Sequence, residues 1–517
     1  MTDIVLTCPE PRGYPGNLGK PFADATSEAI AVVDLGDSAD AQRRTLSCRA
    51  LDAHCDAVAR GLRLAGVHAG DRVVILSLNR WEFVATLLGA MRAGVVPVPI
   101  NVKLPADAVA YIARDADARI AFIGPGLAKL VPAGLRTIEY GRSFESFCDP
   151  GTFDAIEPAP DTVAIQPYTS GSTGRPKGVL LSHYGQNWSR RLIAWNRRTA
   201  PADALLVAAP LYHKNALNAV KQAFTGGARS VLLPQFDVVR YLAAIGAERC
   251  TVISGVPTMM AMLLAQKAQL AATDVSSVRT VMMGSAPASP ALLAELQAVF
   301  PRAEILINYG VTEGGPLPLG PHPDGKPRPL GSVGYPAPGV EVRLVGGASE
   351  DEGEFVTRNP GVLLGYHNLP AETAKRIRDG WYYSSDIFRR DAEGFYTFVG
   401  RTDDMFVCGG ENIFPVEVEA LLEKHPAVNQ AVVLPFAHEL KGQVPYAFVT
   451  LKAGSQTVED ALKTYALAHG PAYMHPRRVF VLDRIPLGGT NKVDVSQLRA
   501  GVTAGLYEPV SQGAPHG

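Results

Sequence analysis

An eleven-residue segment at positions 168–178, YTSGSTGRPKG, carries side chains suited to binding an anion. Glycines allow its backbone to curl so that N–H groups face the anion, and Lys177 adds positive charge. The other donors and turn formers are Thr169, Ser170, Gly171, Ser172, Thr173 and Gly174. The spacing is not that of a Walker A loop. A flexible surface turn is the alternative, but the strand-like VAIQPY before the segment and RPKG within it favour a phosphate-binding loop.

Five further polar motifs follow in order along the chain. They are PLYHKNALN at 210–218, NYGVTEGG at 308–315, GWYYSSD at 380–386, GRTDDMFVCGGENIFPVEVE at 400–419 and PLGGTNK at 486–492. Together with the phosphate-binding segment, they resemble the signatures of the adenylate-forming superfamily, which contains acyl-CoA synthetases, aryl-acid CoA ligases, luciferases and peptide-synthetase adenylation domains. The resemblance covers nearly the full chain and is strongest from 165 to 495.

The resemblance implies a reaction in two steps. A carboxylate attacks the α-phosphate of ATP to give acyl-AMP and pyrophosphate, and a thiol then displaces AMP. Residues 169–174 and Lys177 would hold the β- and γ-phosphates, Thr312 would contact the α-phosphate, and Glu313 would ligate Mg²⁺, a hard cation that suits carboxylate and phosphate oxygens. Because charge accumulates on phosphate oxygens in the first step, donors and cations fixed beforehand should dominate catalysis.

The resemblance also implies a binding slot for the nucleoside. Tyr309 would lie beside the adenine, and the segment GSAP at 284–287 would form the other side. Asp386 would accept hydrogen bonds from the ribose hydroxyls, with Arg401 assisting. The full set implied to contact the nucleotide here is Gly284, Ser285, Ala286, Asn308, Tyr309, Gly310, Asp386 and Arg401. The sequence Ser384-Ser385-Asp386 departs from the usual Thr-Gly-Asp, and a serine at 385 restricts a backbone that normally uses glycine.

Lys492 is the residue that the resemblance identifies as catalytic in the first step, together with Thr312 and Glu313. A lysine near a chain end is usually solvated, but PLGGTNKVDVSQL is similar to the late catalytic-lysine motif of the family. A cation at this position could bridge the carboxylate of the acid and the α-phosphate of ATP, orienting the attack and offsetting charge.

The segment RTDD at 401–404 resembles the family's hinge, with Asp403 at the pivot. The C-terminal unit would then rotate between one pose that presents Lys492 and another that presents the loop CGGEN. In the second pose Gly409 and Gly410 would let a pantetheine arm pass close to the backbone. A turn before a helix that begins near Pro415 is the structural alternative, and both can hold together.

Three arginines are candidates for the phosphates of coenzyme A. Arg477 and Arg478 occupy positions where related ligases place cations, and Arg92 is a further candidate on the other domain. For each arginine the alternative is an ordinary surface ion pair, which contributes little to stability.

The acyl pocket is predicted around His213, Asn215, Gly310 and Gly315. A packed core histidine is the alternative for His213. A helical pattern over 214–225 places Ala216, Ala219, Val220 and Ala223 inward and Lys214, Asn218 and Lys221 outward. Lys214 is therefore expected to be solvated. The small residues leave room for an aromatic or medium-sized acid, and the segments DDMFVCGGENIFPVEVE and TNK most resemble bacterial benzoate-type and medium-chain acyl-CoA ligases.

Several functions compete on this sequence. The leading one is an ATP-dependent acid:CoA ligase, with ATP, Mg²⁺ and coenzyme A as its reactants and cofactor. A ligase that loads acyl groups onto a carrier protein and a non-catalytic nucleotide sensor are alternatives. An amino-acid adenylation domain needs an aspartate in the 210–218 region, where His213 and Lys214 stand instead. Luciferase-like oxygen chemistry is open, but no motif requires it.

The elements that must position these residues indicate an α/β protein. Helical patterns at 49–67 and 81–93 alternate with strand-like runs at 71–78 and 95–100, and this alternation recurs to about residue 310. From about 336 to 400 short strands predict a β-rich subdomain. We therefore expect an N-terminal adenylation domain at 1–401 and a small α+β C-terminal lid domain at 402–517. Ligand-binding loops should lie at the carboxyl ends of the strands.

The amino-acid composition limits the binding partners and the cellular compartment that can be expected for the protein. The 517 residues have 49 basic and 50 acidic side chains, so the net charge of −1 gives no reason for binding nucleic acid or an acidic membrane. The apolar run at 83–102 contains an arginine, prolines and glycines and predicts a buried helix and strand, not a membrane span. Six scattered cysteines and an N-terminus without signal-peptide features predict a cytoplasmic protein. The sequence leaves both a monomer and a homodimer open.

Overall fold

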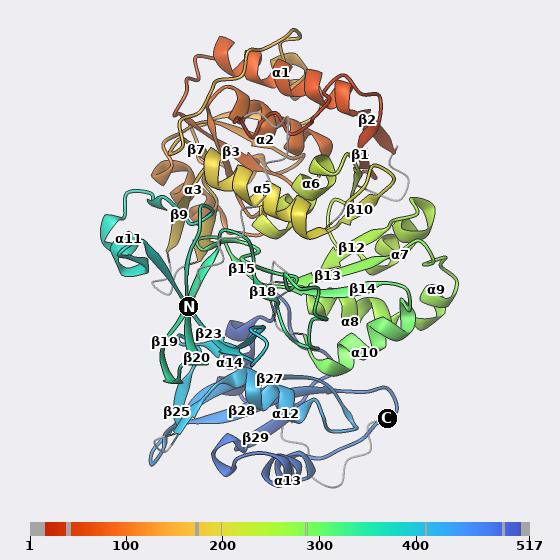
Figure 1. Cartoon of the computed structure of the whole chain (residues 1–517), viewed down its shortest axis with the longest axis vertical. Coiled ribbons are helices and arrows are strands. Elements are labelled where there is room, and N and C mark those ends of the chain that lie inside the picture. The colour runs from red at the N-terminus through yellow and green to blue at the C-terminus, as the bar shows by residue number, and fades with distance from the viewer. Residues whose placement is uncertain are drawn as a thin grey trace.

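The computed structural model describes residues 16–37, 43–170, 175–197, 199–284, 286, 288–408, 411–488 and 492–507. In Figure 1 the N-terminal α/β part fills the upper portion of the molecule, and the strands of residues 406–481 lie with their helices at the lower end. A β-rich sheet lies between the two. The predicted fold class, a large α/β part with a β-rich region and a small mixed C-terminal part, is confirmed.

The largest sheet has seven strands in the order β14-β13-β12-β10-β11-β1-β2. Its strands are parallel except for the pair β1 and β2. They are β1 (Ile30–Asp34), β2 (Arg44–Ser47), β10 (Ala204–Val207), β11 (Arg229–Leu232), β12 (Val252–Gly255), β13 (Thr280–Gly284) and β14 (Glu304–Asn308). Because β13 and β14 are parallel neighbours, the motifs that follow them emerge at the same edge of the sheet.

A second parallel sheet has the order β4-β3-β5-β6. Its strands are β3 (Arg72–Leu76), β4 (Val96–Pro99), β5 (Ala118–Ile123) and β6 (Arg136–Glu139). The predicted helices that flank it are observed as α1 (Cys48–Leu64), whose first turn is capped by the Ser47 side chain, and α2 (Trp81–Arg92), which is buried along its whole length. Burial on all sides is typical of a helix in the interior of a protein. The burial of α2 confirms the buried helix that the apolar run at 83–102 predicts.

The other helices of the N-terminal part cover the two sheets and the site. They are α3 (Ala106–Asp115), α4 (Arg142–Phe147), α5 (His183–Arg197), α6 (Lys214–Thr225), α7 (Val238–Ala247), α8 (Pro257–Ala265), α9 (Lys267–Ala271), α10 (Pro290–Val299) and α11 (Pro370–Arg376). Helix α5 packs against both α6 and the short strand β16 (Gly315–Pro316), so these elements together enclose one side of the site.

The phosphate-binding segment forms a β-hairpin. Strand β8 (Tyr168–Ser170) pairs antiparallel with β9 (Pro176–Ser182), and β9 also pairs with β7 (Val163–Ile165) and β21 (Gly365–Tyr366). The register places Thr169 opposite Lys177. Residues 171–174, which connect the two strands in the sequence, lie outside the described residues.

A twisted antiparallel sheet follows where the sequence predicts β-rich structure. Its strands are β19 (Glu341–Ser349), β20 (Glu352–Arg358), β22 (Ile377–Arg378), β23 (Trp381–Arg390) and β24 (Tyr396–Arg401). Three short antiparallel pairings precede this sheet or join it. Strand β15 (Gly310–Val311) pairs with β16, and β17 (Leu319–Gly320) pairs with β18 (Tyr335–Pro336). The third is an isolated bridge between Gly334 and Tyr396.

The C-terminal part has its own apolar core, which the described residues from Phe406 onward form among themselves. Its sheet contains β25 (Phe406–Cys408), β26 (Glu411–Ile413), β27 (Val428–His438), β28 (Gly442–Leu451) and β29 (Arg478–Val481). Its helices are α12 (Pro415–Leu422), α13 (Glu459–His469) and α14 (Val495–Thr503). This mixture of helices and strands is the one that the sequence predicts for the small C-terminal part.

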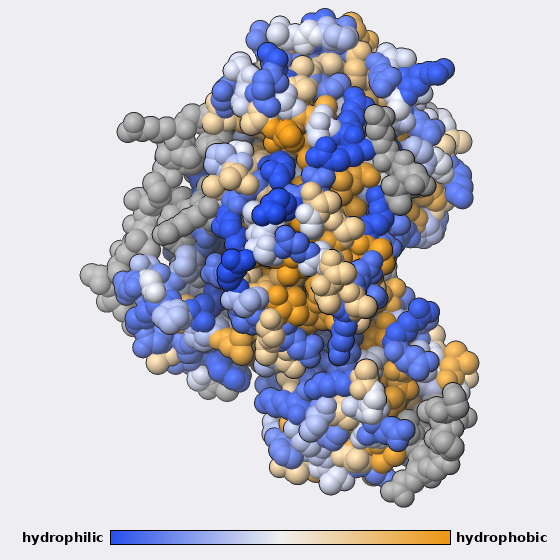
Figure 2. Space-filling model, turned by 90° about the vertical axis from the view of Figure 1, so that its right-hand side faces the viewer, coloured by the Kyte–Doolittle hydropathy of each residue, from blue (hydrophilic) through white to orange (hydrophobic). Residues whose placement is uncertain are grey.

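The surface has mixed polarity. Figure 2 shows apolar residues along the middle of one face with hydrophilic residues to both sides. Among the described helices, none is long and apolar enough to cross a membrane. The five described cysteines are free, and four of them are buried.

Arg92 corrects a sequence prediction. Instead of facing coenzyme A, its side chain is completely buried at the end of α2, where it forms ion pairs with Asp52 and Asp56. It also donates hydrogen bonds to the carbonyl oxygens of Gly19, at 2.7 Å, and Asp52, at 3.1 Å. A buried guanidinium needs such partners because desolvation of the charge is costly. Arg92 therefore joins α1, α2 and the N-terminal segment and is not accessible to a ligand.

Replacing Arg92 tests this structural role. Arg92→Met should lower the free energy of unfolding by about 3 kcal/mol, because it leaves two carboxylates facing a half-empty cation site. Arg119→Met is the control, since Arg119 is 54% exposed and pairs with Asp71 at the surface; its cost should stay within about 0.5 kcal/mol. Urea unfolding measures both, and equal costs would contradict the assignment.

Candidate functional site

The phosphate-binding hairpin and the motif YGVTE meet in the structure. The Thr169 hydroxyl donates a hydrogen bond to Glu313 Oε1 at 2.8 Å, and the Tyr366 hydroxyl donates to the same oxygen at 3.3 Å. Residues separated by 144 positions in the chain are therefore in contact. Of the other predicted loop residues, Gly171, Ser172, Thr173 and Gly174 lie outside the described residues, and Ser170 is described in its backbone only.

Lys177 is held by an acidic residue that sequence reasoning missed. Its Nζ lies 2.5 Å from Glu372 Oε2 on α11 and 5.6 Å from the centre of the Tyr366 ring. Glu372 also pairs with Lys375. The hydrogen bond from Lys177 and then that from Lys375 lower the pKa of Glu372 to about 2. The only sequence signal was the charge pattern AETAKR, which is also typical of any solvated helix.

Asp386 is the centre of the predicted nucleoside slot. The Tyr309 hydroxyl donates to Asp386 Oδ2 at 2.5 Å, and Arg401 Nη1 donates to Oδ1 at 2.9 Å. Asp386 is 2% exposed. Burial raises its pKa, while the positive charge of Arg401 and the Tyr309 hydrogen bond oppose that shift. Tyr309 follows β14 directly, and Asp386 and Arg401 are paired residues of β23 and β24.

The two sides of the slot lie at neighbouring strand ends. Gly284 and Asn308 are paired in the parallel strands β13 and β14. A Cβ added to Gly284 would lie 3.2 Å from the Asn308 carbonyl oxygen and 4.0 Å from Asn215 Nδ2. This close approach brings Asn215 of the predicted acyl pocket next to the predicted nucleotide residues. Ala286 is half-buried, and Ser285 lies outside the described residues.

Ser385 takes the left-handed backbone conformation that glycine prefers, with φ of 62°. Such a conformation costs a residue with a side chain about 1–3 kcal/mol. Three kinds of hydrogen bond offset the cost: Arg376 donates to the Ser385 hydroxyl, the Ser385 N–H donates to Glu354 Oε1 at 2.8 Å, and Thr402 donates to the Ser385 carbonyl oxygen. The departure from Thr-Gly-Asp therefore leaves the turn in place and adds an anchor for Arg376.

Lys492 lies beside the site from the C-terminal part. Lys492 as a whole residue is exposed, but its ammonium group is largely surrounded by protein. This burial lowers the pKa of Lys492, and the charge of Arg401 lowers it further. In turn, burial and then the charge of Lys492 lower the pKa of His213 to about 4, so His213 is neutral at pH 7. The charge of Lys492 therefore acts on His213, before α6, and the charge of Arg401, the last residue of β24, acts on Lys492.

The lysines of α6 contradict the predicted solvent-facing side. Lys214 is half-buried, and its Nζ donates to the Thr312 carbonyl oxygen at 2.9 Å. Lys221 is half-buried as well, and its Nζ donates to Gln186 Oε1 at 2.8 Å. Burial lowers the pKa of each lysine to about 7. The periodicity of α6 correctly places the alanines inward, but α5 covers the face on which the lysines lie.

The remaining residues of the predicted acyl pocket comprise one buried, unpaired histidine nitrogen and two glycines in different surroundings. His213 Nε2 is buried with no hydrogen-bond partner among the described residues. Gly315 has φ of +91°, and a Cβ there would lie 2.5 Å from Asn359 Oδ1, so this position requires glycine. Gly310 is exposed at the start of β15.

The predicted hinge and coenzyme A residues lie at the surface of the C-terminal part or next to it. Asp403 lies 3.4 Å from Arg401 and 3.8 Å from Arg376. Arg477 Nη1 lies 2.7 Å from His475 Nδ1, while Arg478 lies 3.6 Å from Glu459 and also faces the Phe480 ring. Gly409 and Gly410 lie outside the described residues.

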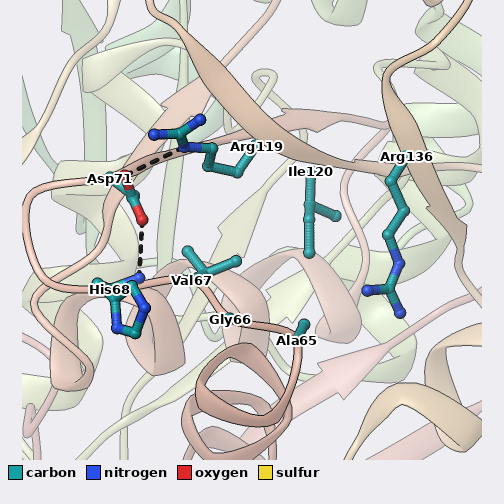
Figure 3. A pocket seen from close by; sticks show the side chains of 8 residues that line it. All are labelled: Ala65, Gly66, Val67, His68, Asp71, Arg119, Ile120 and Arg136. Atoms are coloured by element: carbon teal, nitrogen blue, oxygen red, sulfur yellow. Dashed lines mark hydrogen bonds and ion pairs between the residues drawn. The ribbon is translucent and has the colours of Figure 1, made fainter.

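A separate hollow of about 360 Å³ lies away from these residues. Figure 3 shows its lining, in which Asp71 pairs with Arg119 and accepts a hydrogen bond from the His68 backbone, while Arg136 stands across from them. The hollow is at the N-terminal ends of β3, β5 and β6. Ligands of open parallel sheets bind at the opposite, carboxyl ends, so we do not assign the reaction to it.

The contact between Glu372 and Lys177 gives a test of the phosphate site. Glu372→Gln should tighten ATP binding about two- to fivefold, because the phosphates then no longer compete with a carboxylate for Lys177 and a partly exposed ion pair accounts for a change of that size. Isothermal calorimetry measures the Kd. Glu295→Gln, an exposed change on α10, is the matched control and should leave the Kd unchanged. Weaker ATP binding in Glu372→Gln would show instead that Glu372 holds Lys177 in its working position.

Comparison with known proteins agrees with this geometry. The family model described as AMP-binding enzyme matches residues 20–367, and the model described as AMP-binding enzyme C-terminal domain matches 417–492. A feruloyl-CoA synthase from Amycolatopsis sp. is 34% identical over 86% of this chain and 91% of its own length. A fatty acid–[acyl-carrier-protein] ligase from Streptomyces coeruleorubidus is 31% identical over 88% of this chain and 91% of its own.

A solved structure is similar as well. The o-succinylbenzoate CoA synthetase of Bacillus subtilis, in complex with its acyl-adenylate intermediate, has a TM-score of 0.80 and 28% sequence identity, over 94% of this chain and 98% of its own. With two family models that together span most of the chain and relatives matched along nearly their full lengths, the protein belongs to the AMP-binding enzyme family and is an AMP-forming acyl-CoA synthetase.

Proposed function

We propose that the protein joins an aromatic carboxylic acid to coenzyme A. In the first step the acid's carboxylate oxygen attacks the α-phosphorus of ATP, forming acyl-AMP as pyrophosphate leaves. In the second step the thiol sulfur of coenzyme A attacks the acyl carbon, and AMP leaves. The observations that support the proposal are the contact of Glu313 with Thr169 and that of Asp386 with Arg401, together with the effect of the Arg401 charge on Lys492. The similarity to feruloyl-CoA and o-succinylbenzoate CoA synthetases supports an aromatic acid.

We propose that the nucleoside binds between the ends of β13 and β14, with Tyr309 beside the adenine. Asp386 would accept hydrogen bonds from the ribose hydroxyls. These would replace the hydrogen bond that the Tyr309 hydroxyl now donates to Asp386, or be formed in addition to it. Arg401 would keep Asp386 ionised, because an adjacent cation favours the charged form of a buried carboxylate. Lys177 and the hydroxyl of Thr169 would bind the β- and γ-phosphates.

The residues around Glu313 fit a magnesium ion. Mg²⁺ in nucleotide enzymes is usually held by one or two carboxylates together with phosphate oxygens and water. Glu313 supplies such a carboxylate beside the Thr169 hydroxyl, next to the proposed phosphate site. When bound, the ion neutralises charge on the phosphates. Among the described residues no cluster of three or more acidic, histidine or cysteine side chains forms an all-protein metal site, in keeping with an ion shared with the substrate.

We propose that Lys492 orients the attack by pairing with the acid's carboxylate and the α-phosphate. His213, neutral at pH 7, would lie beside the carboxylate of the acid without adding positive charge. Thr312 would contact the α-phosphate, and its carbonyl oxygen is fixed by Lys214. Donors fixed in this way cost no reorganisation when charge develops in the transition state.

For the second step we propose that residues from 402 onward rotate about Asp403 as a lid domain. The described residues from Phe406 onward form apolar cores among themselves, which supports movement of this part as a unit. Arg477 and Arg478 would face the nucleotide phosphates of coenzyme A, and Gly409 and Gly410 would flank its pantetheine arm. A carrier protein presents the same pantetheine group, and the relative from Streptomyces coeruleorubidus makes loading of a carrier protein the second candidate.

A panel of acids tests the proposed function. Purified enzyme with ATP and Mg²⁺ is given aliphatic, dicarboxylic and aromatic acids, and AMP is measured with and without coenzyme A. Sustained AMP formation that requires both an aromatic acid and coenzyme A is expected. Pyrophosphate exchange without any dependence on coenzyme A would favour the carrier-protein function. No nucleotide turnover with any acid would overturn the proposal in favour of a nucleotide sensor.

Lys492 can be assigned to one half-reaction. Lys492→Ala should lower the rate of acyl-AMP formation about a hundredfold or more, a loss typical of a group that stabilises transition-state charge. Formation of the thioester from supplied acyl-AMP should be largely spared. Pyrophosphate exchange measures the first step and coenzyme A consumption the second. Equal losses in both steps would remove Lys492 from this role.

A change at the proposed hinge should affect the second half-reaction more than the first. Asp403→Pro should impair thioester formation more than adenylation, because proline fixes one backbone torsion at the pivot and so favours one pose over the exchange of poses. The same two assays provide the measurement. A variant that loses adenylation alone would place the pivot elsewhere.

A further inference from the structure

The serine at position 385 keeps a costly backbone conformation for which the turn alone gives no reason. Its φ of 62° lies in the left-handed region, which glycine adopts without the steric cost of a side chain. The N–H and the carbonyl oxygen of Ser385 form hydrogen bonds with Glu354 and Thr402, and a glycine would form both as well. The hydroxyl is therefore what a glycine would lose, and a strained residue points to a function for the group that it carries.

The Ser385 hydroxyl anchors an arginine. It accepts a hydrogen bond from Nη1 of Arg376, the last residue of α11. The second terminal nitrogen of the same side chain, Nη2, lies 3.8 Å from Asp403 Oδ2. Because the guanidinium group is planar and rigid, a hydrogen bond to one of its nitrogens also restricts where the others point. Ser385 thus directs the charge of Arg376 toward Asp403, the proposed pivot.

The segment around the pivot is held by the same turn. Arg401 Nη2 donates to Asp403 Oδ2 at 3.4 Å, and Arg401 Nη1 donates to Asp386 Oδ1 at 2.9 Å. Thr402 donates to the Ser385 carbonyl oxygen twice, from its backbone N–H at 2.8 Å and from its hydroxyl at 3.1 Å. The residues that lead into the C-terminal part are therefore tied to the turn next to the proposed ribose site.

The contact between Arg376 and Asp403 belongs to the pose in which Lys492 faces the site. In this structure the charge of Lys492 acts on His213, which precedes α6. A rotation about Asp403 changes the backbone torsions of that residue and redirects its side chain, while Arg376 stays with α11. The ion pair is then broken, so it stabilises the first pose relative to the second.

We propose that Arg376, anchored by Ser385, is a positioning residue for acyl-AMP formation: its ion pair with Asp403 favours the pose that the first half-reaction needs. The inference rests on the proposed function, because it requires rotation about Asp403. The side chains of Arg376 and Asp403 are 29% and 49% exposed, so water screens the pair and its contribution is modest. A modest contribution suits a domain that must leave this pose in every turnover.

Two variants remove the contact in different ways. Arg376→Met removes the charge. Ser385→Gly removes only the anchoring hydroxyl, and because glycine adopts the left-handed backbone freely, a loss of activity cannot be assigned to a strained turn. Each variant should lower the rate of acyl-AMP formation about two- to fivefold, the size of effect expected from a partly exposed ion pair. Neither should lower the rate of thioester formation from supplied acyl-AMP.

Pyrophosphate exchange with the preferred acid measures the first half-reaction, and coenzyme A consumption measures the second. The double variant should lose no more than Arg376→Met alone, because the hydroxyl acts through the arginine. Arg378→Met is the matched control: Arg378 is exposed on β22 and faces the Tyr383 ring, so both rates should stay at the wild-type level.

Equal losses in both half-reactions would overturn the inference, and so would a wild-type rate of acyl-AMP formation in either variant. Ser385→Gly decides the question if Arg376→Met fails to fold. These outcomes leave the proposed function standing, because both half-reactions still take place. A loss of adenylation alone in Asp403→Pro, or no turnover with any acid, would instead contradict the proposed function and this inference with it.

Discussion

One buried carboxylate connects the parts of the site. Asp386 lies inside the β-rich sheet, and a carboxylate without water must be paired or protonated. Its two oxygens are bound by Tyr309, at the end of the parallel strand β14, and by Arg401, the last residue of β24. The Asp386 carboxylate therefore connects the large α/β part with the β-rich sheet and with the residues that lead into the C-terminal part. Arg401 in turn lies near enough to Lys492 to lower its pKa.

The electrostatics of the site suit reactants that are all anionic. The cations of the proposed site come from β9 (Lys177), α6 (Lys214), β24 (Arg401) and the segment before α14 (Lys492), and its carboxylates include Glu313 and Asp386. Three of these cations have a partner in the structure: Glu372 for Lys177, a carbonyl oxygen for Lys214 and a carboxylate for Arg401. On the proposed mechanism, ATP and the acid would replace some of these partners, so that these three cations would have a polar partner both before and after the substrates bind.

Rigidity and strain are distributed differently over the molecule. The Arg92 cluster holds α1 and α2 together by a completely buried guanidinium with carboxylate and carbonyl partners, far from the proposed chemistry. Next to Asp386, by contrast, Ser385 keeps a left-handed backbone that glycine would adopt more easily. Its hydrogen bonds to Arg376, Glu354 and Thr402 hold the turn from three directions. Strain of this kind persists where surrounding contacts determine the conformation, and here it lies beside the proposed ribose site.

The sequence by itself determined the order of helices and strands, the α/β class and the family, because local periodicity and short motifs depend on neighbouring residues. It also predicted that Thr169, Glu313, Asp386 and Arg401 belong to one site, and the contacts of Thr169 with Glu313 and of Arg401 with Asp386 agree with that prediction. Only the tertiary structure decided which polar residues are covered. The lysines of α6 have the spacing of surface residues, and sequence periodicity cannot tell whether another segment packs on that face; for Arg92 it cannot tell that two carboxylates of α1 pair with it. Glu372 was missed for the same reason: its contact with Lys177 joins residues 195 positions apart, and no local pattern encodes such a pairing.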